Sequence, residues 1–313
     1  MNSSNRPLTF ADVFHLVFVC VASIVVLGWI VKLKGGNPLD LLQALLKGLF
    51  VKASLGRTLD MAAAILIAAC GCAIGANARL WNIGAEGQCL VGFACTCWAA
   101  KAIGDSWLVV PLALTAALIS GGLSGLVACA PSQKGDSHDE VAAGLIFNVM
   151  VGVLLLGYHP EAPPLLFPLI EGWQAPRAGL VAALAVFLIY RYVNDNLAIG
   201  IKMRALPDKN KLQAYAPFVA GAFCGFAGGI LALAGHGSLG TTWGPEGIGF
   251  LAFAIAYLAI GNLWIFIPLL ALFVAAIASG WAPDERVGMT ISALAITIVG
   301  VATFLELRTK EVA

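Results

Sequence analysis

The sequence predicts an all-α membrane protein, a single domain over residues 1–313 with about ten membrane segments, some broken or re-entrant. Composition is the first observation: 60% of the 313 residues are hydrophobic and 11% are charged, whereas roughly a quarter of a soluble domain is charged. The second is a mean hydropathy of +0.91, which excludes disorder because disorder requires low hydrophobicity. The third is the balance of 18 Lys and Arg against 17 Asp and Glu, which leaves no basic surface for nucleic acid.

The first half of the chain contains five apolar runs that resemble spans of a bilayer core, which needs roughly 20 residues. They are Val13–Val31, Met61–Ala78, Cys89–Ile103, a segment within Ser106–Gln133, and Val141–Tyr158. The first run is longer than the apolar core of a signal peptide, so we expect it to be retained as a span. Residues 37–57 carry leucines at helical spacing with charges between them, which predicts an amphipathic helix on the outer membrane surface.

The second half continues with a short span at Ala178–Tyr190, a polar stretch over residues 194–216 and a span at Pro217–Gly235. Gly247–Pro283 carries no charge and is far longer than one span needs, so we expect a hairpin that turns at Gly261-Asn262. Met289–Leu305 is the last predicted span. The distribution of Lys and Arg in the loops favours both termini on the cytoplasmic side. Four tryptophans then fall at outer ends or loops, namely Trp107, Trp173, Trp243 and Trp281.

Residue types that carry catalysis or bind metals are scattered along the chain. The eight cysteines lie inside apolar stretches without a zinc-type spacing, so we expect them to pack as small hydrophobes. The sequence contains neither a phosphate-binding G-x-x-x-x-G-K-[ST] loop nor an H-E-x-x-H pair. We therefore expect no catalytic residue, no metal and no cofactor, and an intramembrane enzyme is poorly supported.

Glycines recur four residues apart in several of the predicted spans, including Gly121/Gly125 and Gly221/Gly225. Small residues at this spacing let membrane helices approach closely, where lipid supplies no hydrophobic drive for association. We interpret these pairs mainly as helix-packing surfaces.

The segment Asn82–Gln88 interrupts two apolar runs with two glycines, two amides and a carboxylate. One interpretation is a cytoplasmic turn between ordinary spans, which the neighbouring Arg79 supports. The other is a broken helix at membrane depth, where irregular backbone is tolerated only inside protein or beside water, and where transport sites often lie. The chemistry alone leaves both open. The candidate residues of this break are Asn82, Gly84, Glu86, Gly87 and Gln88, together with Asn148 in a later span.

We expect the polar residues of this segment to hold a helix break near a pathway rather than to contact a substrate specifically. Glu86 would accept hydrogen bonds from backbone N–H groups that the break leaves unpaired, or from Arg79. Asn148 within a span is more often a polar contact between helices than a ligand.

The polar stretch over residues 194–216 is basic and faces the predicted cytoplasmic side. It is either a solvated loop, as the distribution of positive charge would produce, or a docking helix for a cytoplasmic partner. In the second case we expect a short helix over Asp208–Tyr215, which begins near Pro207 and ends because Pro217 disfavours helix at Ala216. Leu212 and Tyr215 would form its apolar face.

Several of these interruptions, in this order, resemble one family of membrane proteins. Leu80-Trp81-Asn82-Ile83-Gly84-Ala85-Glu86-Gly87-Gln88 is similar to the signature of permease subunits of ABC importers in the simple-sugar, nucleoside and branched-chain amino acid group, closest to its nucleoside branch. Asp139-Glu140-Val141 with Phe147-Asn148 and the start and end of Arg204–Ala216 are similar to further segments of that family. The glycine-rich run Gly221–Gly228 and Gly247-Ile248-Gly249-Phe250 also match, and the resemblance covers roughly residues 30–280.

The resemblance implies a multi-pass permease of a bacterial inner membrane that forms a translocation pathway and performs no catalysis itself. It implies a second permease subunit, cytoplasmic ATP-binding subunits and an extracytoplasmic substrate-binding protein as partners. The ATP-binding subunits would contact Arg204, Asp208, Leu212 and Tyr215. The cargo would be a nucleoside, with simple sugars and branched-chain amino acids as alternatives.

A stand-alone, ion-coupled secondary transporter is the main alternative from another class, and a structural membrane scaffold is a weaker one. Ion coupling calls for ionisable groups deep in several spans, and here only Glu86 clearly qualifies.

Overall fold

The computed structural model describes residues 10–33, 35–104, 106–129, 137–156, 177–198, 200–201, 211–234, 247–258 and 266–280. These residues form ten α-helices and no strand, so the predicted all-α fold is confirmed. In chain order the helices are α1 (Phe10–Leu33), α2 (Leu39–Phe50), α3 (Lys52–Asn77), α4 (Ala85–Ile103), α5 (Val109–Cys129), α6 (Ser137–Leu156), α7 (Arg177–Asn196), α9 (Lys211–Leu233), α10 (Ile248–Leu258) and α11 (Phe266–Gly280).

Three of the described helices, α3, α5 and α9, are long and apolar enough to cross a membrane. Shorter apolar helices occur within α1, α6, α10 and α11. This pattern agrees with the predicted mixture of full spans and shorter segments. The predicted hairpin turn at Gly261-Asn262, the last span Met289–Leu305 and the residues Trp173, Trp243 and Trp281 lie outside the described residues.

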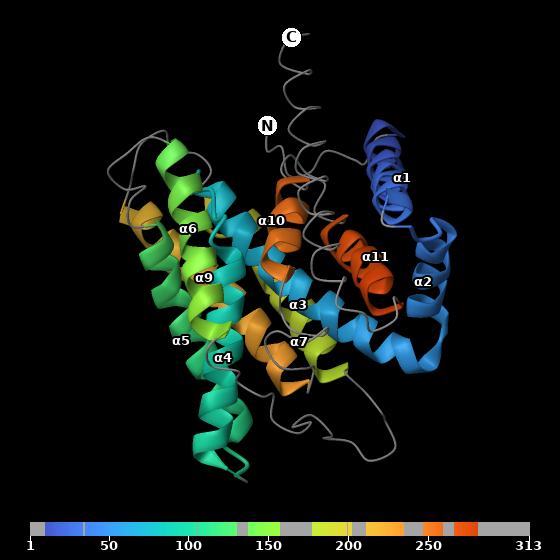
Figure 1. Cartoon of the computed structure of the whole chain (residues 1–313). Helices are drawn as coiled ribbons and strands as arrows, with labels where there is room; N and C mark the ends of the chain where they lie inside the picture. The colour runs from blue at the N-terminus through green and yellow to red at the C-terminus, as the bar shows by residue number, and fades with distance from the viewer. Residues whose placement is uncertain are drawn as a thin grey trace, which may run out of the picture.

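Helices α3 and α9 form the centre of the molecule. The apolar part of α3 is 83% buried, whereas that of α5 is 44% buried. In Figure 1, α3 runs obliquely through the molecule from the side of α2 toward the side of α6, while α4, α5 and α6 gather on one flank. A helix that is apolar all round must be covered on all sides by protein or lipid. The apolar side chains of α3 are covered by protein, and those of α5 are covered on one face only.

Glycines allow α9 to pack against α5 with backbone in contact with backbone. A methyl group placed on Gly121 would lie 2.5 Å from the carbonyl oxygen of Gly221 and 2.6 Å from the Cα of Gly225. Gly125 in turn lies against Pro217 and Gly221, so the two helices run antiparallel. The interpretation of these glycines as packing surfaces is therefore confirmed.

Helices α2 and α11 also approach each other closely. Gly48 lies against the backbone of Ala276, and Gly280 lies against the backbone of Ala44. The Thr58 hydroxyl donates to the carbonyl oxygen of Gly48 at 2.8 Å and also pairs with the Ser279 hydroxyl. This junction fixes the start of α3 against the end of α11.

The predicted surface helix over residues 37–57 is wrong in its extent. Helix α2 ends at Phe50, Val51 adopts an extended conformation, and Lys52 begins α3, which therefore includes Lys52–Arg57. The leucine spacing and charges of this stretch predict one continuous amphipathic helix, but the extended residue Val51 separates α2 from α3. Helix α2 itself buries Leu41, Ala44 and Gly48, which are spaced on one face.

All eight cysteines lie in described helices and are free, six of them buried and two partly buried. The prediction that they pack as small apolar side chains is confirmed. Many large apolar side chains on the outer faces of α1, α5, α6 and α7 are exposed, for example Val25, Ile119, Val149 and Leu188. Such faces are expected where lipid or another membrane subunit covers the protein.

Candidate functional site

Helix α3 ends at Asn77 in a capped turn that redirects the chain. Arg79 adopts a left-handed conformation with φ of +59°. Its N–H donates to the carbonyl oxygen of Ala76 at 3.0 Å, and the N–H of Leu80 donates to that of Gly75 at 2.9 Å. These two bonds form the Schellman motif, which usually places Gly at the left-handed position. The chain therefore leaves α3 with its last carbonyls satisfied.

Two buried amides hold the segment that follows. The Nδ2 of Asn82 donates to Oε1 of Gln88 at 3.0 Å, and the Nε2 of Gln88 donates to Oδ1 of Asn82 at 2.8 Å. Both side chains are buried, Asn82 at 3% and Gln88 at 0% relative exposure. A reciprocal pair satisfies both amides where water is excluded, so it closes the turn around Ile83-Gly84 against the first turn of α4.

Asn148 of α6 supplies the cap that the start of α4 lacks. Gly84, the residue before α4, makes no side-chain capping bond of its own. Instead the N–H of Gly87 donates to Oδ1 of Asn148 at 2.8 Å, and the Nδ2 of Asn148 donates to the carbonyl oxygen of Ile83 at 2.8 Å. One side chain thus satisfies a donor of the first turn and a carbonyl of the break, the two kinds of group that a helix break leaves unpaired.

The Glu86 carboxylate in turn caps the N-terminal end of helix α10. Its Oε1 accepts a short hydrogen bond from the N–H of Gly247, and its Oε2 accepts from the N–H of Gly249 at 2.8 Å and of Phe250 at 3.3 Å. These three groups form the N-terminal end of α10. A carboxylate is favourable there because the free N–H groups and the helix dipole both attract negative charge. Glu86 is 5% exposed.

Two glycines make this contact between α4 and α10 possible. Gly247 has φ of +89°, a conformation that residues with a side chain rarely adopt. A methyl group on Gly249 would overlap the backbone of Ala85 and Glu86. The start of α10 is therefore pressed directly against the first turn of α4.

The N-terminal end of helix α10 lies inside the protein. The 11 described residues of α10 extend about 16 Å at 1.5 Å per residue. Glu86 lies at the N-terminal end of α10. Trp81 lies against a later part of the same helix, where its ring contacts those of Phe253 and Tyr257. A helix end buried in this way needs an internal partner for its N–H groups, and Glu86 provides one.

The structure brings together all six sequence-predicted residues of the break. Asn82, Glu86, Gln88 and Asn148 are buried, and so are Gly84 and Gly87. Their burial matches a break inside the protein rather than a solvated surface turn. Glu86 accepts from backbone N–H groups, as expected, but those groups belong to α10 and not to the break. Sequence reasoning missed this partner, although the glycines at 247 and 249 were a signal that backbone is closely approached there.

The candidate coupling stretch over residues 194–216 divides between two helices. Helix α7 extends to Asn196, and α9 already begins at Lys211. The prediction that Pro217 ends a short helix is wrong, because α9 continues through Pro217 to Leu233. Neighbouring helices compensate a proline inside a membrane helix, and here the Pro217 carbonyl lies against Gly125 of α5.

The residues predicted for coupling are only partly visible. Arg204, Asp208 and the side chain of Leu212 lie outside the described residues. Tyr215 lies in the second turn of α9 and is 69% exposed.

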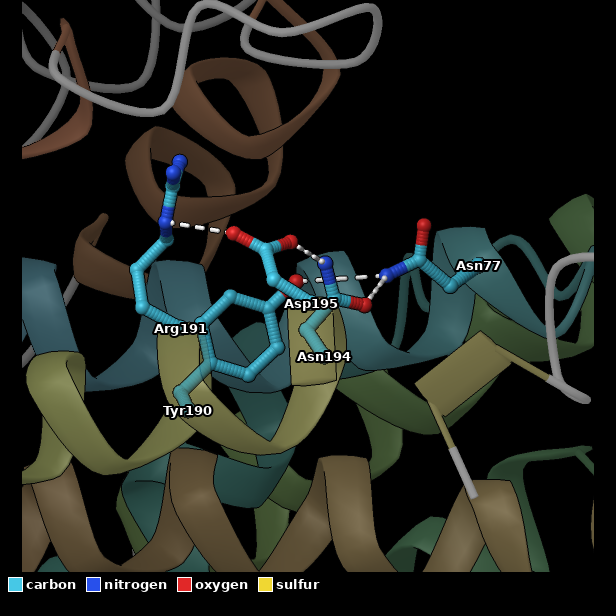
Figure 2. A network of polar contacts seen from close by, with 5 residues as sticks. All are labelled: Asn77, Tyr190, Arg191, Asn194 and Asp195. Atoms are coloured by element: carbon cyan, nitrogen blue, oxygen red, sulfur yellow. Dashed lines mark hydrogen bonds and ion pairs between the residues drawn. The ribbon is translucent and has the colours of Figure 1, made fainter. Parts of the chain in front are cut away.

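A polar network joins the end of α3 to the end of α7 (Figure 2). The Nδ2 of Asn77 donates to the Tyr190 hydroxyl oxygen at 3.2 Å and to Oδ1 of Asn194 at 2.9 Å. Asn194 donates in turn to Asp195 at 3.0 Å, and Asp195 pairs with Arg191 at 2.9 Å. The end of α3, which leads into the break, is thereby connected to α7, which leads into residues 194–216.

A cavity of about 300 Å³ lies beside this network, between α3, α7 and α9. Asn77, Tyr190 and Asn194 line it together with Tyr215, and the rest of its wall is apolar. Within the described residues no group of three or more His, Cys, Asp or Glu side chains is arranged to hold a metal ion.

Comparison with known proteins finds two similarities. Residues 54–162 match the model of a family described as the permease component of branched-chain amino acid transport systems. The matched stretch includes most of α3, the break, α4, α5 and α6. The chain is also 24% identical to the guanosine ABC transporter permease protein NupP of Bacillus subtilis (strain 168), over 289 residues that cover 81% of this chain and 82% of that protein. Both similarities agree with the resemblance predicted from the motifs.

Proposed function

We propose that this chain is the permease subunit of an ATP-driven importer whose cargo is a nucleoside. The observation that carries this proposal is the similarity to a guanosine permease along four-fifths of both chains. The buried break supports it, because broken helices whose ends lie inside the protein are typical of the sites through which solutes cross membranes. The permease itself performs no catalysis, and separate subunits hydrolyse ATP.

The proposed assembly contains a second permease subunit, cytoplasmic ATP-binding subunits and an extracytoplasmic substrate-binding protein, in a bacterial inner membrane. Both termini lie on the cytoplasmic side. Arg204, Asp208, Leu212 and Tyr215 contact the ATP-binding subunits. Exposure of Tyr215 at the start of α9 supports this, since a docking surface must be accessible before the partner binds.

The engagement of Glu86 argues against ion-coupled transport by the chain alone. A proton-carrying carboxylate must exchange partners as it is protonated and released. The Glu86 carboxylate instead accepts three backbone N–H groups of α10. Its chemistry fits a structural anion that holds two helices together.

Branched-chain amino acids are the second candidate cargo, because the matching family model carries that description. Uptake assays separate the two. Radiolabelled guanosine, ribose and leucine are offered to cells that lack their own nucleoside uptake and that express this chain together with the proposed ATP-binding and substrate-binding subunits. We expect guanosine uptake that disappears when the phosphate-loop lysine of the ATP-binding subunit is replaced.

Two results would overturn parts of the proposal. Uptake of leucine or ribose without guanosine would reassign the cargo. Uptake that persists with the inactive ATP-binding subunit and collapses with a protonophore would establish an ion-coupled transporter. The purified chain alone should hydrolyse no ATP, since the sequence contains no phosphate-binding loop.

A further inference from the structure

Three aromatic rings form a cluster where the break meets α10. The Trp81 and Tyr257 rings are stacked, with centroids 4.6 Å apart and planes inclined by 30°. Phe253 lies one helical turn before Tyr257, 4.5 Å from its ring and 6.2 Å from that of Trp81. Such spacings are those of favourable aromatic pairs.

Solvent exposure of the rings increases across the cluster from Phe253 to Trp81. Phe253 is 6% exposed and anchors the rings in the core, Tyr257 is partly buried, and Trp81 is 38% exposed. The Glu86 carboxylate fixes the N-terminal end of the helix that carries Phe253 and Tyr257, and Glu86 follows Trp81 by five residues. Both sides of the aromatic stack therefore lie on segments whose backbone is positioned by the same break.

We propose that Trp81 is the residue of this permease on which the base of the transported nucleoside stacks, with Tyr257 as the positioning residue that holds the indole. The proposal rests on the proposed function and deepens it. An aromatic face binds any nucleobase by stacking, without a particular set of hydrogen bonds. Ribose and leucine have no aromatic face, so this surface distinguishes a nucleoside from the other two cargoes. Trp81 lies at the edge of the contact between the break and α10, whereas the buried polar residues of that contact make their hydrogen bonds within the protein.

The experiment uses the assembled importer in lipid nanodiscs and in proteoliposomes. Trp98 is the matched control, because it is 41% exposed and lies on α4 beside Val91 and Val151, away from the cluster. Guanosine should quench part of the tryptophan fluorescence of the nanodisc-embedded permease without its binding protein. Trp81→Phe should abolish that quenching, while Trp98→Phe should retain it. Because Trp81→Phe keeps a ring, its guanosine uptake should stay within about two-fold of the wild type.

Trp81→Leu removes the ring and should lower guanosine uptake about ten-fold per assembled importer, in line with the contribution of one base stack. ATP hydrolysis stimulated by the loaded binding protein should persist. Unchanged uptake per assembled importer with a lower yield would show that Trp81 is only a headgroup anchor and would overturn the proposal. Quenching that survives in Trp81→Phe would overturn it even if Trp81→Leu fails to assemble. If the wild-type importer takes up leucine or ribose but no nucleoside, the proposed function fails and this inference falls with it.

Discussion

Polar residues of the break act on backbone groups of other elements. Asn148 of α6 caps α4, and Glu86 of α4 caps α10, while Asn82 and Gln88 satisfy each other. Among the described residues no buried side-chain nitrogen or oxygen lacks a hydrogen-bond partner. In lipid an unpaired polar group finds no water to replace the lost bond. Each of these side chains is therefore needed to satisfy a polar group of a neighbouring side chain or helix.

The first prediction concerns the carboxylate of Glu86. Glu86→Leu leaves three backbone N–H groups of α10 unpaired at about 1–3 kcal/mol each, so the detergent-solubilised protein should lose several degrees of thermal stability or fail to accumulate. Glu86→Gln keeps an acceptor oxygen and should be milder. Asp40→Leu changes an exposed acidic residue of α2 and should have little effect. Heating followed by size-exclusion chromatography measures all three, and normal stability of Glu86→Leu would contradict the capping role.

The second prediction concerns the pair of amides. Asn82→Ala leaves the Gln88 amide buried without its partner, and Gln88→Ala does the converse. The double substitution removes both groups, so its cost should be smaller than the sum of the single costs by about 1 kcal/mol or more. Denaturant titration of the four proteins measures this coupling energy. Strictly additive costs would show that the two amides do not depend on each other.

At the scale of elements, the fold depends on helices that touch through glycine. Helix α9 meets α5 and α4 where Gly121, Gly92 and Gly225 face one another. Without a hydrophobic drive between helices in lipid, this close fit supplies the dispersion contacts that hold them. A helix that meets its neighbours in this way has no room for even one more carbon.

The third prediction compares two glycines inside helices. Gly121→Ala places a methyl group against the backbone of α9 and should destabilise the protein by about 1–3 kcal/mol. Gly152→Ala in α6 has nothing within 4 Å of the new carbon, so it should be neutral or stabilising by up to about 1 kcal/mol, because Ala favours helix. Thermal unfolding in detergent measures both. Equal tolerance of the two substitutions would refute tight packing between α5 and α9.

Sequence patterns predicted the helices well where an apolar run has polar ends, as for α1, α5 and α6. They failed where a local signal was overruled by packing. Pro217 predicts a helix boundary by its own geometry, yet α9 continues because α5 covers that turn. The residues of the break could be identified from their polarity within an apolar run. Their partners could not, since nothing in the spacing links Glu86 to Gly249 across more than 160 residues.

At the scale of the whole molecule, side chains connect the end of the helix before the break to the candidate coupling stretch over residues 194–216. Asn77, the last residue of α3, contacts Tyr190 and Asn194 near the end of α7 (Figure 2). The same cavity wall includes Tyr215 of α9. The elements around residues 194–216 therefore adjoin the end of the helix that leads into the break.

The fourth prediction tests where the ATP-binding subunit docks. Leu212→Asp with Tyr215→Asp should leave the membrane fold intact but release the ATP-binding subunit in a detergent pull-down, because two charges replace apolar contacts. Trp107→Asp is the control, since Trp107 is 85% exposed and precedes α5, at the opposite end of the antiparallel α5–α9 pair. Retained binding together with ATP-driven uptake in the double variant would place the docking surface elsewhere on the permease.

The central position of α9 has a consequence for how the protein is made. Helices α3, α4 and α5 leave the ribosome well before α9, which ends about a hundred residues after Cys129. At ~5–20 residues per second, that interval lasts roughly 5–20 s. During this time the glycine faces of the inserted helices α3, α4 and α5 lack their packing partner α9, which has not yet been translated. A nascent chain stalled in this window exposes a surface that membrane proteases and insertion chaperones can recognise as unfinished.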